Sequence, residues 1–442
     1  MERIRNIIVL LRGQLWILPL ILSVLALGLA YWVLTFGPSL LEGWGGGELW
    51  WIYGGDASSA RGLLSSLLSG LMTMFSLVVS VTFVILTLAA NQLGPRLVPN
   101  FMGDRQIQAV IGLFLGTILY VLFVLRSLNE QLGSEGVPHA AVTIGSVLTV
   151  VCLFALLFYV HKVARAIVAD NIVARVAHDL HNNVRSMLPE TGEGDGAMPD
   201  DIPPKAGTVS LGRSGYIQVI DYDRLVSVAC REGALLEVKV RAGHFVLAGG
   251  EHVVVHAVRP LDNETVAAIR DAAVIGEERS PAQDLEHGLR QLVEIALRAL
   301  SPGINDPHTA MAVLDRLGAA LEEIFQRSLP PTLLHDPQGA VRVIARRSDV
   351  QGLSDAAFDP IRQAGQEIPA VLIRMADVLG QLASIVRRRE ARDAVVQHLG
   401  KLVETAEAAR LAPCDRAAIL LRIEQARIAT SARLKEATIH VL

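Results

Sequence analysis

The apolar stretch at residues 67–90, LLSGLMTMFSLVVSVTFVILTLAA, decides the fold of this protein. It contains no Asp, Glu, Lys, Arg or His, and a helix of about 20 mostly apolar residues is long enough to cross the hydrocarbon core of a bilayer. Similar runs without charged residues occur at residues 15–36, 107–125 and 140–160. The sequence therefore predicts a membrane protein, with an α-helical bundle of four transmembrane spans in residues 1–160.

The composition agrees with a membrane location and excludes other classes of protein. Hydrophobic residues make up 51% of the 442 residues, and a mean hydropathy of +0.41 is too high for an ordinary soluble enzyme. Charged residues are sparse before residue 160 and dense after it, which separates a membrane half from a soluble half. The formal net charge of -4 provides no broad cationic field, so we expect no nucleic acid partner.

The distribution of basic residues predicts the orientation of the chain. Lys and Arg are enriched on the cytoplasmic side of transmembrane helices. They occur before the first span, between the second and third, and after the fourth, whereas acidic residues dominate residues 37–61 and 126–139. We therefore expect a multi-pass inner-membrane protein with both termini in the cytoplasm.

A row of polar residues, here called the hydroxyl seam, runs along the second span. Its members recur at spacings of three, four or seven, which places them on one helical face. Such a seam either packs against another helix, because small hydroxylated residues allow close approach, or lines a narrow aqueous path. Both interpretations are open for the seam residues, which are Ser69, Thr73, Ser76, Ser80, Thr87 and Asn91.

The absence of charge inside the spans restricts the transport mechanism. No Asp, Glu, Lys, Arg or His lies in the middle of a span, although proton relays and ion-coupled carriers usually need such a group at depth. A conducting form would therefore be a passive channel. Four spans provide few helices to surround a pore, so this channel would be a homo-oligomer. In the third span, Gly112 and Gly116 form a GxxxG pair that predicts close helix packing.

The soluble half is predicted to have four parts. Residues 161–188 continue the fourth span as a helical stalk, and the Pro, Gly and acid-rich residues 189–207 form a linker. Residues 208–260 contain the β-prone runs GYIQVI, LVSVAC, LLEVKV and HVVVHAV, which predict a small β-barrel or sandwich. Residues 261–442 are predicted to form an α-helical cytoplasmic domain.

One loop in the helical domain has two possible roles. Ser280, Pro281 and Gln283 predict the start of a helix, which Pro302 and Gly303 end. Asp306 before Pro307 is a typical N-cap of the next helix. The loop is therefore either an ordinary capping loop or an anion or ligand site at the free amides of the second helix. The candidate residues are Ser301, Asn305, Asp306 and His308.

The sequence predicts no metal site, no cofactor and no enzymatic activity. His178 and His181 are three residues apart, but no further ligand is placed to complete a metal shell. The three cysteines are far apart and form no CxxC pair, which excludes a zinc ribbon or a disulfide framework. No Walker loop, dinucleotide fingerprint, nucleophile elbow or HExxH motif is present.

Two longer stretches resemble the signature regions of a known family. They are FSLVVSVTFVILTLAANQLGPRLVPNFMGDRQIQ at residues 75–108 and LRQLVEIALRALSPGINDPHTA at residues 289–310. Both resemble predicted bacterial membrane proteins of the family called domain of unknown function 2254. This resemblance implies four N-terminal spans and a cytoplasmic domain, and it implies no activity. The matching positions are Asn91, Gln92, Pro95, Arg96, Asp104, Ser301, Pro302, Asn305, Asp306 and Pro307.

Two hypotheses for function follow. In the first, the protein is a homo-oligomeric, channel-like protein of the lipid bilayer that passes ions or small solutes along the hydroxyl seam, with a regulatory cytoplasmic domain. Its cytoplasmic mouth would contain Gln92, Pro95, Arg96 and Asp104. In the second, the spans anchor a sensor or scaffold whose cytoplasmic domain binds a ligand or a protein partner.

Overall fold

The computed structural model describes residues 16–43, 53–93, 104–128, 137–166, 169–190, 198–199, 201–259 and 262–439. The chain divides into two compact units, Met1–Asn171 and Ile172–Leu442.

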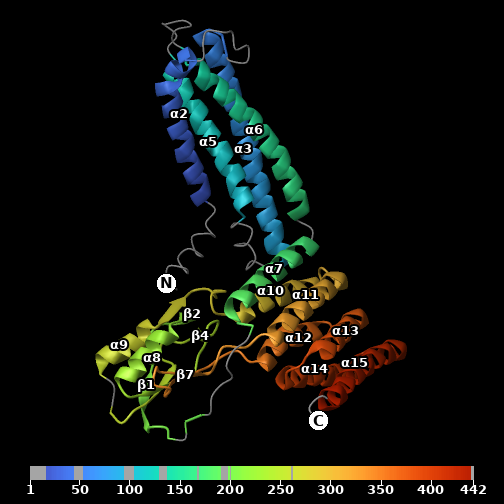
Figure 1. Ribbon diagram of the computed structural model, residues 1–442. Helices are drawn as coiled ribbons and strands as arrows, with labels where there is room; N and C mark the ends of the chain where they lie inside the picture. Colours follow the sequence, from blue (N-terminus) through green and yellow to red (C-terminus); the bar gives the residue numbers. More distant parts are fainter. Residues whose placement is uncertain are drawn as a thin grey trace. The chain divides into compact units, whose positions relative to one another are not determined.

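Four long helices lie side by side in the first unit (Figure 1). They are α2 (Ile17–Gly43), α3 (Ala57–Leu93), α5 (Arg105–Ser127) and α6 (His139–Ala166). Each contains a segment long and apolar enough to cross a membrane, so the four predicted spans are confirmed: Ile17–Phe36, Ala57–Leu88, Arg105–Ser127 and His139–Val163. Helix α3 begins ahead of the predicted span because Asp56 caps it, with Oδ1 accepting a hydrogen bond from the Ser59 amide at 3.2 Å.

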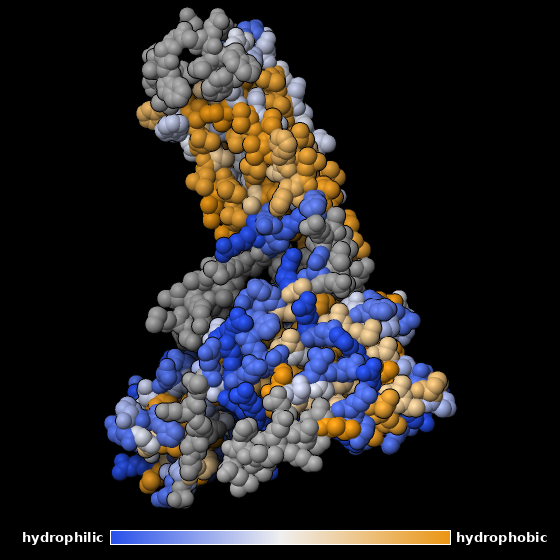
Figure 2. Space-filling model, turned by 45° about the vertical axis from the view of Figure 1, so that its right-hand side comes forward, coloured by the Kyte–Doolittle hydropathy of each residue, from blue (hydrophilic) through white to orange (hydrophobic). Residues whose placement is uncertain are grey.

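Helix α5 is the central helix of this bundle. It contacts α2, α3 and α6, and 67% of its most apolar segment is buried, against 22% for each of the other three spans. Hydrophobic side chains, shown in orange, cover much of the face of the bundle seen in Figure 2, and many large hydrophobic side chains of the four helices are exposed. An exposed apolar surface of this kind is typical of a protein surrounded by lipid.

The GxxxG pair of α5 allows α2 to approach closely. A Cβ atom at Gly112 would lie 2.9 Å from the Cα atom of Pro19, and one at Gly116 would lie 3.1 Å from the Cβ atom of Ala26. Both distances are shorter than an optimal carbon–carbon contact of about 3.5–4.0 Å. The packing role predicted for Gly112 and Gly116 is therefore seen between α5 and α2.

The stalk was predicted as a continuation of the fourth span. Helix α6 ends at Ala166 and helix α7 (Ala169–Met187) begins at Ala169, while residues 167–168 lie outside the described residues. The apolar side of α7 packs within the second unit, since a Cβ atom at Gly288 would lie 2.9 Å from Leu180. His181 pairs with Glu323, so this histidine has a carboxylate partner of its own.

The β-prone segment forms two open sheets together with strands from residues 261–442, which were predicted to be helical. The barrel in the predicted barrel or sandwich is not seen. The larger sheet has the order β1-β5-β3-β8-β7 and the smaller β4-β2-β6, and neither closes on itself. The pairing of β3 with β8 is parallel, and all other pairings are antiparallel. The larger sheet contains β1 (Lys205–Val209), β3 (Leu235–Val238), β5 (Val253–His256), β7 (Leu333–His335) and β8 (Val341–Ala345), and the smaller contains β2 (Gly215–Ile220), β4 (Phe245–Val246) and β6 (Ala273–Gly276).

The run LVSVAC, predicted as a strand, is helical. It lies in α8 (Tyr222–Arg231), where Asp221 caps the helix by accepting a hydrogen bond from the Arg224 amide at 3.0 Å. Leu225, Val228 and Ala229 are buried, and their spacing of three and four residues is that of one helical face. A second short helix, α9 (Asn263–Asp271), follows the strand β5.

Helices dominate the rest of the second unit. They are α10 (Leu285–Ala299), α11 (Pro307–Gln326), α12 (Val350–Ala364), α13 (Pro369–Ile385), α14 (Arg389–Ala408) and α15 (Pro413–Ile439). Helix α10 begins later than Ser280 predicted, because Asp284 is its N-cap and accepts a hydrogen bond from the Glu286 amide at 3.1 Å. The side-chain amide of Gln283 instead forms two hydrogen bonds with the backbone of Ile220 in β2. Its Oε1 accepts from the Ile220 amide at 2.9 Å, and its Nε2 donates to the Ile220 carbonyl at 3.1 Å.

Candidate functional site

The hydroxyl seam of α3 faces away from its own bundle. Leu64, Leu71 and Val78 on α3 are buried, whereas the described seam side chains are all exposed: Ser69, Thr73, Ser76, Ser80 and Thr87. Since a helix turns about 100° per residue, the buried positions and the seam lie on opposite sides of α3. The described seam side chains therefore do not pack against α2, α5 or α6. The side chain of Asn91 lies outside the described residues.

Part of the seam satisfies its hydroxyl groups within α3. The Thr73 hydroxyl donates to the Ser69 carbonyl at 3.0 Å, and the Thr87 hydroxyl donates to the Phe83 carbonyl at 2.9 Å. Such local bonds make a hydroxyl tolerable at a lipid-facing position. Among the described residues, the hydroxyl groups of Ser69, Ser76 and Ser80 have no hydrogen-bond partner, so these three seam positions are the most polar.

Asp104, assigned to the cytoplasmic mouth by the sequence, joins two helices. Its carboxylate caps α5, accepting a hydrogen bond from the Gln106 amide at 2.9 Å, and forms an ion pair with Lys162 of α6. Both side chains are mostly buried. The side chain of Gln92, and the whole of Pro95 and Arg96, lie outside the described residues, so the mouth stays a prediction.

The loop from Ser301 to His308 has the geometry of a helix cap. The Asp306 carboxylate accepts hydrogen bonds from the Thr309 amide at 3.1 Å and the Thr309 hydroxyl at 2.6 Å. The bond from the Thr309 side chain lowers the pKa of Asp306. Asn305 adopts the left-handed conformation, with a φ of 50°. The first turn of α11 thus already has a carboxylate beside its amides, and the ligand interpretation of this loop gains no support.

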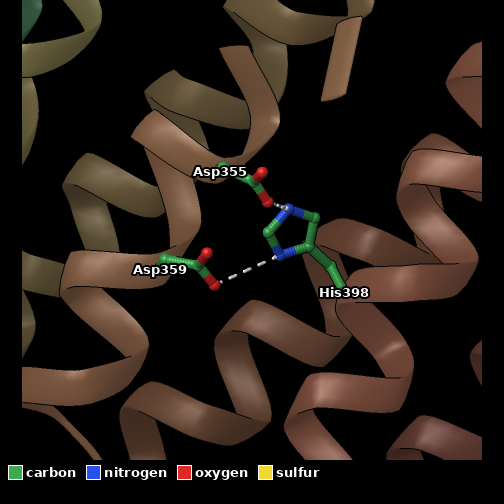
Figure 3. A group of neighbouring side chains, drawn as sticks. All are labelled: Asp355, Asp359 and His398. Atoms are coloured by element: carbon green, nitrogen blue, oxygen red, sulfur yellow. Dashed lines mark ion pairs between the residues drawn. The ribbon is translucent and has the colours of Figure 1, made fainter. Parts of the chain in front are cut away.

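A cluster that the sequence analysis missed lies between α12 and α14. Asp355 and Asp359 project from successive turns of α12 toward His398 of α14 (Figure 3). Their carboxylate oxygens and one ring nitrogen all lie within 4.8 Å of one another. The signal in the sequence was a pair of acidic residues four apart on one helix. The third member could not be found, because the packing of α12 on α14 is not evident from local patterns.

The electrostatic surroundings of the cluster keep its imidazole neutral and the Asp355 carboxylate charged. His398 is 1% exposed, and burial, together with the charge of Lys401, lowers its pKa to about 4. Burial acts to raise the pKa of Asp355, but hydrogen bonds from Lys401 and Gln351 outweigh it and hold that pKa below its ordinary value. At neutral pH, a neutral imidazole therefore faces the ionised carboxylate of Asp355.

Comparison with known proteins identifies the family. The family described as predicted membrane protein, DUF2254, matches residues 12–381, so the chain belongs to this family, as the two signature stretches indicated. It is 30% identical to uncharacterized proteins of Mycobacterium bovis and of Mycobacterium tuberculosis strain H37Rv, over 95% of this chain and 81% of each relative. No solved structure matches the chain.

Proposed function

We propose that this member of the DUF2254 family is a homo-oligomeric membrane protein, in which the hydroxyl seam of α3 lines a passive permeation path between subunits. One observation supports the proposal: the seam is exposed on the side of α3 opposite its own bundle. Hydroxyl groups gain little from lipid chains, whereas a facing helix or a column of water can bond to them. Further copies of the chain and ions or small solutes are the partners that this arrangement suits.

The proposal includes an orientation in the membrane. We place both chain ends on the cytoplasmic side of an inner membrane, because basic residues flank the spans on that side. The second unit then lies in the cytoplasm, where it can regulate the path.

Disulfide crosslinking tests whether seams of two copies meet. The exposed Cys230 and Cys414 are first replaced by Ser, and Ser76→Cys or Ser80→Cys is then introduced. Oxidation in native membranes should give covalent dimers for both variants. Val147→Cys on α6 is the matched control, because Val147 is 56% exposed but lies off the seam. Equal crosslinking at position 147, or none at 76 and 80, contradicts a seam-to-seam interface.

Solute flux tests permeation. Purified protein in liposomes should pass small ions or solutes, and Ser76→Leu or Ser80→Leu should block the flux by placing an apolar group in the path. Met72→Leu is the control, since Met72 is also exposed on α3 and this exchange conserves volume. Absence of flux in wild-type protein that crosslinks at the seam would refute a channel.

An absence of flux would favour a second function, a membrane-anchored sensor or scaffold. A specific feature supports this alternative: a hollow of about 590 Å³ where the end of α11 meets the connection from α13 to α14. It is lined by three apolar side chains, Phe325, Ile385 and Val386, and by four polar ones, Glu322, Gln326, Arg387 and Arg388. Polar side chains of this kind can orient a small polar ligand.

A further inference from the structure

We propose that Asp355, Asp359 and His398 form a binding site for one divalent transition-metal ion of the Zn²⁺ or Mn²⁺ class, and that Lys401 competes with the ion for the two carboxylates. This inference concerns the second unit alone and does not depend on the permeation proposal. It departs from the sequence analysis, which predicted no metal.

One potential ligand atom from each of the three side chains lies within 4.8 Å of the others. His398 Nε2 lies 3.2 Å from Asp355 Oδ1, and His398 Nδ1 lies 3.8 Å from Asp359 Oδ1 (Figure 3). Metal–ligand bonds of about 2.0–2.2 Å to nitrogen and oxygen place neighbouring ligands about 3 Å apart. The two carboxylates lie nearest to different ring nitrogens, so a single ion would bind one of these nitrogens, and the imidazole or the other carboxylate would turn to complete the set of one nitrogen and two oxygens.

The histidine points to a ligand independently of the acidic pair. His398 is 1% exposed, and neither of its ring nitrogens has a hydrogen-bond partner among the described residues. A buried polar group without a partner is costly, and where a native protein keeps one, an ion or a water molecule commonly accounts for it. A metal ion would use the lone pair of the imidazole.

Lys401 and Arg362 supply positive charge at this place. The Nζ atom of Lys401 donates to Asp355 Oδ1 and to Asp359 Oδ2, each at 2.7 Å, and Arg362 forms an ion pair with Asp359 at 3.4 Å. Lys401 is the cation that bridges the two carboxylates, and neither cation bonds His398. Because the Lys401 side chain is 23% exposed and its stem is flexible, it can turn toward solvent when a divalent ion takes its place.

The surroundings hold the carboxylates in position and suggest the class of metal. Arg362 bonds the Thr405 hydroxyl at 2.7 Å and lies 3.4 Å from Asp359 Oδ1, while Gln351 donates to Asp355 Oδ1 at 2.8 Å. Such outer partners orient metal ligands. Two carboxylates with one imidazole mix hard and intermediate donors, a set that suits Mn²⁺ and Zn²⁺ better than Ca²⁺ or Cu⁺.

Manganese binding to the full-length protein tests the site. The protein is purified in detergent with a tag that contains no histidine, and free Mn²⁺ is followed by electron paramagnetic resonance. We expect each chain to bind one Mn²⁺ ion, and we expect Zn²⁺ to displace it. Asp355→Asn and Asp359→Asn should each weaken binding by about tenfold or more. Asp393→Asn, an exposed acid on α14, is the matched control and should bind as wild type does.

Lys401→Met separates a metal site from a plain ion-pair cluster. Removal of the competing charge should strengthen Mn²⁺ binding by about tenfold, and Mn²⁺ should raise the melting temperature of this variant more than that of Asp355→Asn. Folded wild-type and Lys401→Met proteins that both fail to bind Mn²⁺ would overturn the proposal. Binding that survives both Asp355→Asn and Asp359→Asn would also overturn it, since the ion would then lie elsewhere.

Discussion

Asp306 connects a loop and a helix through a single carboxylate, which bonds both the amide and the hydroxyl of Thr309. Loss of an N-cap of this type costs about 1 kcal/mol. Asp306→Ala should therefore lower the free energy of unfolding of the full-length protein by about that amount, measured by denaturant unfolding in detergent. Asp306→Asn should retain most of the stability, because Asn is also a good N-cap. The exposed His308 provides the control, and a comparable loss in His308→Ala would show that the loop does more than cap α11.

Single residues could be predicted from the sequence where their partners are local. The cap at Asp306 was predicted because the residues that it bonds follow directly in the chain. The capping role of Gln283 was wrong because its amide bonds Ile220 in a distant strand. The role of His398 could not be predicted for the same reason, since its neighbours on α12 are brought near only by tertiary packing.

At the scale of elements, the same distinction applies to strands and helices. The runs at β2, β3 and β5 were predicted from their β-prone composition, but LVSVAC has an equally β-prone composition and forms α8 instead. Its cap at Asp221 and its buried face outweigh the intrinsic preference of valine for strands. The strand β8 pairs with β3 across a long stretch of chain, and such a non-local pairing leaves no local signal.

The contact between α2 and α5 permits a test at this scale. Gly112→Val places a branched side chain where Cα of Pro19 is only 2.9 Å from the new Cβ position, so the two helices must separate. We expect a loss of about 1–3 kcal/mol, as for other overpacked contacts, seen as a lower melting temperature in detergent. Gly70→Val on α3 is the control, since nothing lies within 4 Å of its Cβ position. An unchanged melting temperature for Gly112→Val would contradict the close packing of α2 on α5.

At the scale of the whole molecule, the bilayer makes the membrane half easy to predict. Each span must by itself be long and apolar enough to cross the lipid, so length and apolar composition identified all four. The sheets and helices of the second unit depend on one another, and their arrangement could not be inferred in the same way. The outward direction of the hydroxyl seam also needed the structure, because the sequence defines a polar face without showing where it points.

The orientation of the chain has a direct test, because two native cysteines report on the second unit. Cys230 and Cys414 are exposed and Cys152 is buried. If both termini are cytoplasmic, a membrane-impermeant maleimide should label the native protein only after spheroplasts are opened. Ser134→Cys, with Cys230 and Cys414 replaced by Ser, should be labelled in intact spheroplasts, since its segment is expected outside. If Cys414 and residue 134 are labelled from the same side, the chain does not cross the membrane four times between cytoplasmic ends. The proposed cytoplasmic location of the second unit would then also be refuted.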